Sequence, residues 1–241
     1  MKAVAVILAS GSGHRFGANK VPKHLTPILG VPILVWTLNT AINSSIFSSV
    51  IVVTRKDDLS DTESVLSEYF NKDEFPILLT EGGKERTESF LFGFQNLVNA
   101  NLVDSESIVA LFDANRPFTP ESQLRALYEV ALDGECSVPA RPVVNGVAKA
   151  ESGRILEVPI KSSFVEFVTP EFLRLNAFNF ESKSFMKGYN CFVEFALALG
   201  FQPLTIKANE LNAKLTYPED KTYIEGVALD NKLITPSKLN I

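Results

Sequence analysis

The fold of this chain is organised around residues 3–23, AVAVILASGSGHRFGANKVPK. It opens with an unbroken apolar run over residues 3–9, and a short run rich in Val and Ile is typical of a strand buried on both faces. Small residues follow at 10–13, where backbone N–H groups can turn towards a ligand that approaches closely. The cations that come next are Arg15, Lys20 and Lys23. A buried strand, a glycine turn and clustered cations predict a phosphate-binding loop.

Two common phosphate motifs do not fit this loop. A P-loop needs Lys and then a hydroxyl directly after its last glycine, but here Gly17 is followed by Ala18. The dinucleotide fingerprint is G-x-G-x-x-G, whereas Gly11, Gly13 and Gly17 are spaced one residue more widely. A plain strand-to-helix turn is the alternative interpretation, and the close placement of the cations favours a phosphate site over it.

The composition bounds the class of protein. The chain has 241 residues, 46% of them hydrophobic, which suits one large domain or one domain with an appendage. Its net charge of −5 gives no support to a general nucleic-acid binder. Cys136 and Cys191 show neither metal-ligand spacing nor a disulfide framework, so a reducing compartment is expected. With no signal peptide and no membrane-spanning run in the sequence, the expected location is the cytoplasm.

Strand and helix patterns alternate four times along the first part of the chain. Strands are expected at 3–9, 48–54, 76–80 and 107–112, and helices at 33–43, 59–70, 87–97 and 119–132. This order predicts an α/β fold with a parallel sheet and helices on both faces. Ligands bind such sheets at the carboxyl ends of the strands. The polar motifs that follow three of these strands, at 10–23, 82–89 and 113–117, are therefore expected to meet at one edge.

The pattern changes after residue 135. A strand is expected over 136–144, and Asn145-Gly146 is a strong hairpin signal. We expect residues 141–161 to form a β-rich arm that leaves the sheet. Because an isolated hairpin is marginal in water, this arm is expected to pack on a second subunit. The remaining elements expected are helices at 171–175 and 190–199, a strand at 202–207 and a last helix from 218.

Several side chains near the predicted edge suit phosphate chemistry. Lys23 follows Pro22, and a restrained lysine beside a glycine turn can neutralise charge that builds on a phosphate in a transition state. Arg15 can hold the same phosphates through two hydrogen bonds. Asp113 ends a buried strand, where a carboxylate can position Mg²⁺ or a ribose hydroxyl, or only cap a turn. Arg116 can bind a second anion or pair with Asp113.

The double glycine Gly82-Gly83 also has two interpretations. It lies within Glu81–Arg86, directly after a predicted strand. A surface turn is the simpler reading, and a close approach of the backbone to a flat group such as a base is the other.

Five motifs together resemble one family along the whole chain. ASGSGHRFG at 9–17 and PKHL at 22–25 resemble A-A-G-x-G-x-R-M-G…P-K-Q-Y/F-L. GGKERTES at 82–89 matches G-G-x-x-R-x-x-S, and FDANRP at 112–117 resembles H-D-A-A/V-R-P. TPEF at 169–172 resembles Q-T-P-Q-x-F with a shorter spacing, and AKLTYPED at 213–220 resembles N-I-K-V-T-x-P-E-D. The family is that of the 2-C-methyl-D-erythritol 4-phosphate cytidylyltransferases, with their relatives the ribitol-5-phosphate cytidylyltransferases. The resemblance is very specific up to Pro117 and looser beyond it.

The resemblance implies a Rossmann-like, mostly parallel sheet with helices on both faces, in a single nucleotidyltransferase domain over residues 1–241 with 141–161 as a protruding β-arm. It also implies an ordered reaction. CTP binds first, together with Mg²⁺ or another divalent cation. A polyol phosphate then attacks the α-phosphorus of CTP in line. Pyrophosphate leaves, and a CDP-polyol forms. The implied partner is a second copy of the chain, in a homodimer made through the arm, with neither nucleic acid nor membrane involved.

The resemblance assigns roles by position. The catalytic residues are Arg15 and Lys23 at the triphosphate and Lys214 at the α-phosphate. Nucleotide binding falls to Ala9, Ser10, Gly11, Gly13, Gly83, Lys84, Ser89 and Asp113. Asp113 also serves the metal. The residues that hold the acceptor phosphate are Arg116, Lys161 and Thr169.

The acceptor half departs from the family pattern. Lys161 is the nearest match to an arginine of the family, and a lysine keeps the charge but loses the two-pronged geometry. The arm motif D-T-[MIV]-K is poorly matched at 145–149, and Tyr189-Asn190-Cys191 stands where the family has T-D-[DE]-A-S. Methylerythritol phosphate is the default acceptor, with ribitol-5-phosphate or another sugar or alditol phosphate of surface polysaccharides as the alternative. Use of another nucleoside triphosphate, and a non-catalytic nucleotide-binding role, also remain open.

Overall fold

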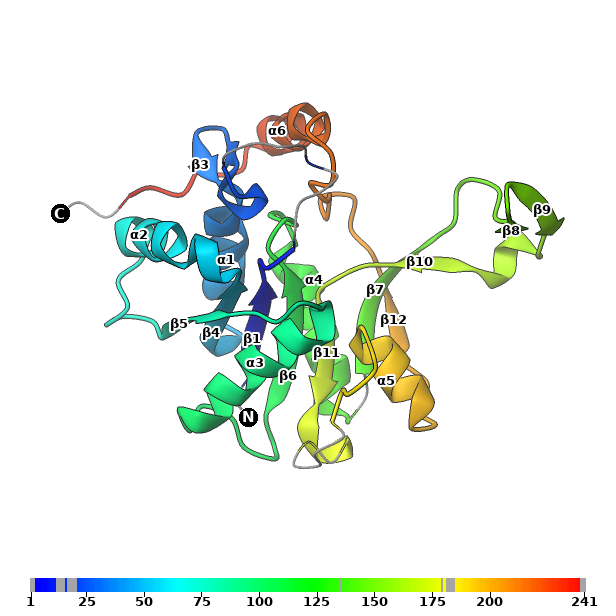
Figure 1. Cartoon of the computed structure of the whole chain (residues 1–241), viewed down its shortest axis with the longest axis horizontal. Coiled ribbons are helices and arrows are strands. Elements are labelled where there is room, and N and C mark those ends of the chain that lie inside the picture. Colours follow the sequence, from blue (N-terminus) through cyan, green and yellow to red (C-terminus); the bar gives the residue numbers. More distant parts are fainter. Residues whose placement is uncertain are drawn as a thin grey trace.

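A computed structural model describes residues 3–11, 16, 21–134, 136–178, 180 and 185–238 of the chain. A central sheet carries helices on both faces, and a long extension leaves it on one side (Figure 1). The strands are β1 (Ala3–Leu8), β2 (Pro27–Ile28), β3 (Val31–Pro32), β4 (Phe47–Thr54), β5 (Ile77–Glu81), β6 (Ile108–Asp113), β7 (Cys136–Pro142), β8 (Lys149–Glu151), β9 (Arg154–Glu157), β10 (Val165–Phe167), β11 (Glu171–Arg174) and β12 (Leu204–Lys207). The helices are α1 (Ile33–Asn43), α2 (Leu59–Tyr69), α3 (Arg86–Asn99), α4 (Glu121–Leu132), α5 (Phe192–Ala198) and α6 (Asp220–Asp230).

The central sheet is mixed and mostly parallel. Its strand order in the described residues is β10-β7-β11-β6-β1-β4-β5, and β12 also pairs with β7. Strands β5, β4, β1 and β6 run parallel, whereas β11 is antiparallel to both of its neighbours, β6 and β7. The predicted α/β fold with helices on both faces is therefore confirmed.

Strand β1 lies between β4 and β6 and is buried along its whole length, as its apolar run predicts. Because successive side chains of a strand point to opposite faces, the run serves two cores. Ala3, Ala5 and Ile7 pack with residues of α1, α2 and α4. Val4, Val6 and Leu8 pack with residues of α3 and α5. The sheet is thus held between two helical layers, and the carboxyl end of β1 is fixed from both sides.

Gly93 sets how closely α3 packs on the sheet. A Cβ atom at this position would lie 2.5 Å from Cγ2 of Val53 and 3.1 Å from Cγ1 of Val6. Both distances are shorter than an ordinary van der Waals contact, so only glycine allows this separation. The first turn of α3, which begins at Arg86, is thereby held near the ends of β1 and β4.

The helix predicted at 171–175 is wrong, because residues 171–174 form strand β11. Phe172 and Leu173 are fully buried and face opposite cores. The strand fills the place between β6 and β7 and pairs with both. Tertiary pairing therefore overrides the local helical pattern.

A third apolar cluster closes the end of the sheet near the polar motifs. Trp36 packs edge-on against Phe118, with ring centroids 5.2 Å apart, and its Nε1 donates to the carbonyl of Ile28 at 3.1 Å. Leu215 and Ile224, from the chain around α6, are fully buried in the same cluster. This cluster fixes the loops that precede α4 and α6.

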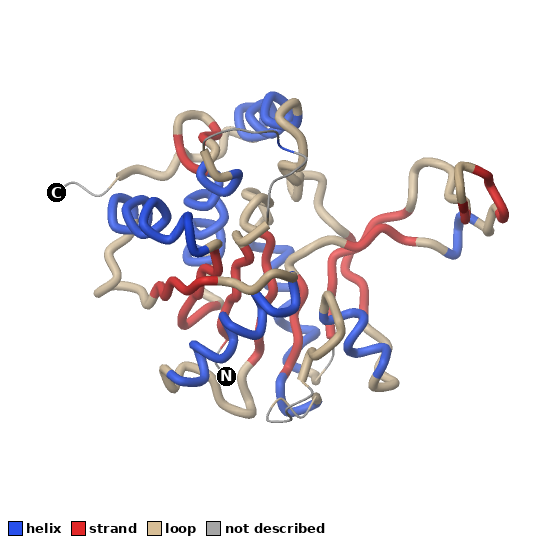
Figure 2. The backbone as a smooth tube through the Cα atoms, viewed as in Figure 1, coloured by secondary structure: helices blue, strands red, loops and turns tan. Residues whose placement is uncertain are grey.

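Residues 142–165 form the extension that leaves the sheet, and β8 and β9 make an antiparallel hairpin at its far end (Figure 2). At its root, the Arg141 guanidinium makes two hydrogen bonds of 3.0 Å to the Glu166 carboxylate. Its large exposed apolar side chains are Val144, Ile155, Leu156, Val158, Ile160, Phe164 and Val165. Among the residues that the structure describes, no helix has both the length and the apolar character needed to cross a lipid bilayer.

Candidate active site

A cavity of about 480 Å³ lies where the chain leaves β1, β4, β5 and β6. This volume is typical of small-molecule sites. The cavity is lined by Leu8, Ala9, Ser10, Gly11, Lys23, His24, Arg55, Gly83, Lys84, Glu85, Arg86, Ser89, Asp113, Ala114, Asn115 and Lys214. Of these described lining residues, five are Lys or Arg and two are acidic. The cavity therefore suits a ligand with several negative charges.

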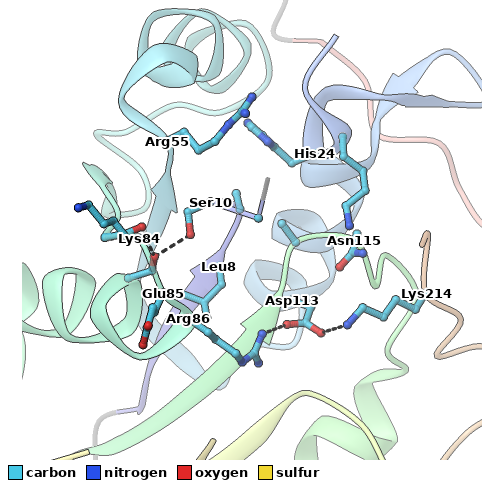
Figure 3. Close-up of a pocket in the computed structure, with 16 residues that line it drawn as sticks. Leu8, Ser10, His24, Arg55, Lys84, Glu85, Arg86, Asp113, Asn115 and Lys214 are labelled. Carbon is cyan, nitrogen blue, oxygen red and sulfur yellow. Dashed lines mark hydrogen bonds and ion pairs between the residues drawn. The ribbon is translucent and has the colours of Figure 1, made fainter. Parts of the chain in front are cut away.

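Asp113 is the centre of the charged cluster in the cavity. Arg86 Nη1 donates to its Oδ1 at 2.5 Å, and Lys214 Nζ donates to its Oδ2 at 2.8 Å. Figure 3 shows these two cations approaching the carboxylate from opposite sides. Arg116 Nε lies 3.7 Å from the same Oδ2, and the Arg116 side chain is largely buried. The strand end thus gathers cations that are far apart in sequence.

The ionisation of this cluster follows from its geometry. Burial alone would raise the pKa of the Asp113 carboxyl, but the charges of Arg86 and Lys214 and their hydrogen bonds hold that pKa far below its usual range. Burial lowers the pKa of the Arg116 guanidinium, and the charge of Asp113 opposes this change. Asp113 therefore carries its negative charge throughout the physiological range.

Main-chain contacts position the Lys214 segment. Asn115 exchanges two hydrogen bonds with Leu215, one of 2.5 Å from its Nδ2 and one of 2.9 Å to its carbonyl. Arg116 Nη1 donates to the Asn212 carbonyl at 2.9 Å. Residues on both sides of Lys214 are thus fastened to the loop after β6, which explains how a residue about 100 positions away reaches Asp113.

The double glycine is required by contacts within the protein. A Cβ atom on Gly82 would lie 2.9 Å from Cβ of Ser10, and one on Gly83 would lie 2.3 Å from Cβ of Glu88. Ser10 Oγ in turn donates to Ser89 Oγ at 2.8 Å. The loops after β1 and β5 therefore lie directly against each other at one wall of the cavity. Packing against Ser10 and Glu88 therefore explains both glycines, and the close approach of this backbone to a base stays a prediction.

His24 fixes the segment that presents Lys23. Its ring Nε2 lies 2.9 Å from Thr62 Oγ1 and 3.4 Å from Thr54 Oγ1, so it links a short 3₁₀ turn over 23–25 to α2 and β4. Burial lowers the pKa of His24 to about 4. The ring is neutral at physiological pH, and it supports the wall beside Lys23 without adding charge.

The structure brings most of the residues expected from the sequence to this one cavity. Those that line it are Ala9, Ser10, Gly11, Lys23, Gly83, Lys84, Ser89, Asp113 and Lys214. Arg116 does not line the cavity, but its Nε lies 3.7 Å from the Asp113 carboxylate. Gly13 and Arg15 fall outside the described residues.

The two other expected acceptor residues do not line the cavity. Thr169 is buried, and its carbonyl accepts a 2.8 Å hydrogen bond from Asn212 Nδ2. Lys161 lies in the extension, where its Nζ donates to the carbonyl of Val144 at 2.8 Å. Lys161 is therefore not a wall of the cavity in its own chain.

Sequence reasoning missed several wall residues. Arg86 belongs to the G-G-x-x-R-x-x-S motif, which was the available signal, but its pairing with Asp113 joins residues 27 positions apart. Arg55 follows β4 and is paired with Asp58 through two hydrogen bonds of 2.7 and 3.0 Å. The partner of Arg55 is only three residues away in the sequence, but no sequence motif indicates that Arg55 lines a cavity. Asn115 was noted only as part of a motif and acts through its main-chain partners.

The described residues contain no group of three or more His, Cys, Asp or Glu side chains placed to hold a metal ion. A Mg²⁺ ion that bridges substrate phosphates needs only one or two protein carboxylates. Asp113 offers one, and because a carboxylate has about four lone-pair positions, its two cation partners leave room for a metal. The residues present therefore fit a metal that is held largely by the phosphates of a ligand.

Comparison with known proteins gives a family along nearly the whole chain. The model of the family described as IspD, 2-C-methyl-D-erythritol 4-phosphate cytidylyltransferase, matches residues 3–228. A 2-C-methyl-D-erythritol 4-phosphate cytidylyltransferase of Bacillus velezensis is 28% identical over 94% of this chain and 96% of its own length. A ribitol-5-phosphate cytidylyltransferase of Lactiplantibacillus plantarum is 23% identical over 90% of this chain and 94% of its own length.

Solved structures agree in fold. A 4-diphosphocytidyl-2C-methyl-D-erythritol synthase superposes with a TM-score of 0.76 at 23% identity, over 94% of this chain and 98% of that one. The 2-C-methyl-D-erythritol 4-phosphate cytidylyltransferase of Thermus thermophilus gives a TM-score of 0.70 at 20% identity, over 95% of this chain and 100% of that one. At these identities the two structures support the fold, and the sequence comparisons support the family.

Proposed function

This chain belongs to the IspD family of 2-C-methyl-D-erythritol 4-phosphate cytidylyltransferases, and from that premise we propose that its cavity binds CTP and that a polyol phosphate attacks there. The reaction transfers CMP and releases pyrophosphate. The observation that carries the proposal is the arrangement around Asp113, where a buried carboxylate and cations from three segments meet beside the loop after β1.

The cavity divides the work between its walls. The loops at 9–11 and 82–84 form one wall, and we assign them to the base and ribose because their backbone groups are closely packed and fixed. Lys23 and Lys214 come from separate segments that line the cavity, and Lys214 lies beside Asp113 (Figure 3). We assign these cations, together with Arg15, to the triphosphate, and Arg116 to the acceptor phosphate.

In-line attack on the α-phosphorus places new negative charge on its oxygens. A cation fixed in advance at that position lowers the barrier, because it needs no reorganisation during the reaction. Asp113 and the Leu215 main chain hold Lys214 in place, and the turn anchored by His24 presents Lys23. When bound, Mg²⁺ supplies further charge neutralisation on the phosphates, with Asp113 as its protein ligand.

The acceptor is proposed to be 2-C-methyl-D-erythritol 4-phosphate. A second candidate, ribitol-5-phosphate, is favoured by two observations: a relative named for that substrate aligns over 90% of the chain, and the sequence departs from the family pattern at 145–149 and 189–191. Both acceptors are polyol phosphates, so the cation cluster suits either one.

The extension at 142–165 is proposed to join two copies of the chain. After β9 the extension exposes Val158 and Ile160 at 72% and 76% of their surface, and grouped exposed apolar side chains of this kind are typical of protein–protein contacts. Thr169, at the sheet end, and Lys161, on the extension, are proposed to serve the acceptor, with Lys161 reaching the cavity of the neighbouring copy. This arrangement accounts for the place of Lys161 away from the cavity of its own chain.

A matrix of substrates tests the function. Pyrophosphate release is measured with CTP, UTP, ATP and GTP against methylerythritol, ribitol, glycerol and sugar phosphates. We expect release with CTP and one polyol phosphate. Release with another nucleotide would move the chain to a different substrate class, and CTP binding without turnover on any acceptor would favour a non-catalytic role.

A variant then ties the activity to the cavity. Lys23→Ala removes a cation proposed for the triphosphate, and nearly all turnover should be lost. Glu121→Gln is a matched control, because its exposed partner Arg125 lies on α4 outside the cavity lining. Wild-type rates in Lys23→Ala would contradict the assignment of this wall.

A further inference from the structure

Glu171 is a buried carboxyl group that the proposed reaction does not use. It begins β11, directly after Thr169 and Pro170, and only 1% of its surface is exposed. Its Oε2 accepts a 3.1 Å hydrogen bond from the backbone N–H of Val193, in the first turn of α5. Because burying a carboxyl group is costly, this position needs a compensating role.

The segment before α5 is fastened to the cavity as well as to Glu171. The Tyr189 carbonyl accepts a hydrogen bond from Thr87 Oγ1, and the Asn190 carbonyl accepts one of 3.1 Å from Arg86 Nε. Thr87 and Arg86 are the first residues of α3. The segment 189–193 therefore bridges β11 and the start of α3.

A continuous set of contacts thus runs from Glu171 to the reacting side of the cavity. Glu171 holds Val193, and three residues earlier the Asn190 carbonyl holds Nε of Arg86. Nη1 of Arg86 binds Oδ1 of Asp113, whose Oδ2 binds Lys214. Arg86 is held at two of its nitrogens, so its guanidinium plane is set by the place of the 189–193 segment.

We propose that Glu171 is a positioning residue for the reaction: its carboxyl oxygen fixes the 189–193 segment, and through Asn190 that segment orients Arg86 against Asp113. The inference rests on the proposed function of the cavity. It concerns the very segment in which this chain departs from the family pattern.

The role requires a hydrogen-bond acceptor and no charge. Burial raises the pKa of Glu171 to about 7, although the nearby Arg86 acts in the opposite direction. Both forms of a carboxyl group can accept a hydrogen bond from an N–H group, as can the amide oxygen of glutamine.

Two substitutions at Glu171 distinguish the effect of its hydrogen-bond acceptor from the effect of its side-chain volume. Glu171→Gln keeps an oxygen for Val193, whereas Glu171→Met fills similar space without one. The Met variant leaves the Val193 N–H without its acceptor, which costs about 1–3 kcal/mol, less than the roughly 5–15 kcal/mol by which native proteins are stable. We expect kcat/KM for CTP to fall 10- to 100-fold in the Met variant and to stay within threefold of wild type in the Gln variant.

A double variant tests the route through Arg86. If Glu171 acts by orienting that side chain, then Glu171→Met combined with Arg86→Ala should cost no more than Arg86→Ala alone. If instead the losses in kcat/KM of the two single variants multiply in the double variant, the proposal is overturned. The matched control is Glu106→Gln, because Glu106 binds Arg174 at the opposite end of β11 and should leave the kinetics unchanged.

The remaining outcomes are also decisive. Wild-type kinetics in Glu171→Met, or an equal loss in the Gln variant, would overturn the proposal. If the Met variant does not fold, hydrogen exchange of the Val193 amide in the wild-type protein decides, since the proposal requires it to be protected. Absence of any CTP-dependent pyrophosphate release in wild type would instead contradict the proposed function of the cavity.

Discussion

Asp113→Asn is the substitution that best tests the charged cluster. The carboxylate holds Arg86 at 2.5 Å and Lys214 at 2.8 Å, with Arg116 at 3.7 Å. Asparagine keeps the shape but removes the charge, and its amide nitrogen is a donor where Lys214 needs an acceptor. The cations would then face one another without the carboxylate between them.

The loss of stability expected in Asp113→Asn follows from the burial of the ion pairs. Breaking a buried ion pair costs about 3–5 kcal/mol. The side chains of Arg86 and Lys214 are 32% and 36% exposed, so water can partly solvate them once they are released. We therefore expect the free energy of unfolding to fall by the lower end of this range, about 3 kcal/mol. This loss corresponds to a fall of about 1 M in the urea midpoint.

Urea unfolding followed by Trp36 fluorescence measures this change, and CTP turnover should fall in the same variant. The pKa of Asp113 is held far below its ordinary value of 3.8, so its stabilisation is complete above that pH and is lost as the pH falls further. The difference between wild type and variant should thus be constant from about pH 5 to 8 and shrink in acid.

The control is Glu121→Gln, which breaks an exposed pair with Arg125 and should change stability by less than about 0.5 kcal/mol. If Asp113→Asn proved as stable as wild type, the carboxylate would not be what holds the cations together, and the account of the cluster would be refuted.

Three further predictions concern other parts of the molecule. The pKa of Glu171 is raised from 4.5 to about 7, so wild type should lose stability relative to Glu171→Gln as the pH rises through this range. In urea titrations above pH 8, the difference in the free energy of unfolding should approach about 3 kcal/mol. Gly93→Ala should destabilise the protein by about 1–3 kcal/mol, because the new methyl group meets Val53; an unchanged thermal midpoint would argue against the close packing of α3. Val158→Ser with Ile160→Ser should reduce the mass measured in solution to that of one chain, and a dimer that survived would exclude the extension as its main contact.

The sequence carries much of the fold because its strongest signals are local. The apolar run at 3–9 is buried on both faces by helices that the 3.6-residue pattern predicts. The glycine loop and Asp113 both lie at strand ends, so the parallel order alone brings them to one edge. Lys214 was placed by family resemblance only.

Long-range pairing explains what the sequence could not supply. Strand β11 reads as helical because its pattern is short, and only the place between β6 and β7 makes it a strand. The contact of Arg86 with Asp113 and the burial of Glu171 arise from loops that meet in space without a shared motif. The resemblance predicts an acceptor role for Lys161, but in its own chain this residue lies on the extension.

The fate of the α-phosphate of CTP distinguishes CMP transfer from other phosphate transfers. CTP labelled at that phosphorus is incubated with Mg²⁺ and the polyol phosphate found in the substrate matrix, and the products are separated. The account predicts that all of the label joins the polyol product, with one pyrophosphate released for each molecule formed. Transfer of the γ-phosphate to the polyol, with CDP as the second product, would contradict it.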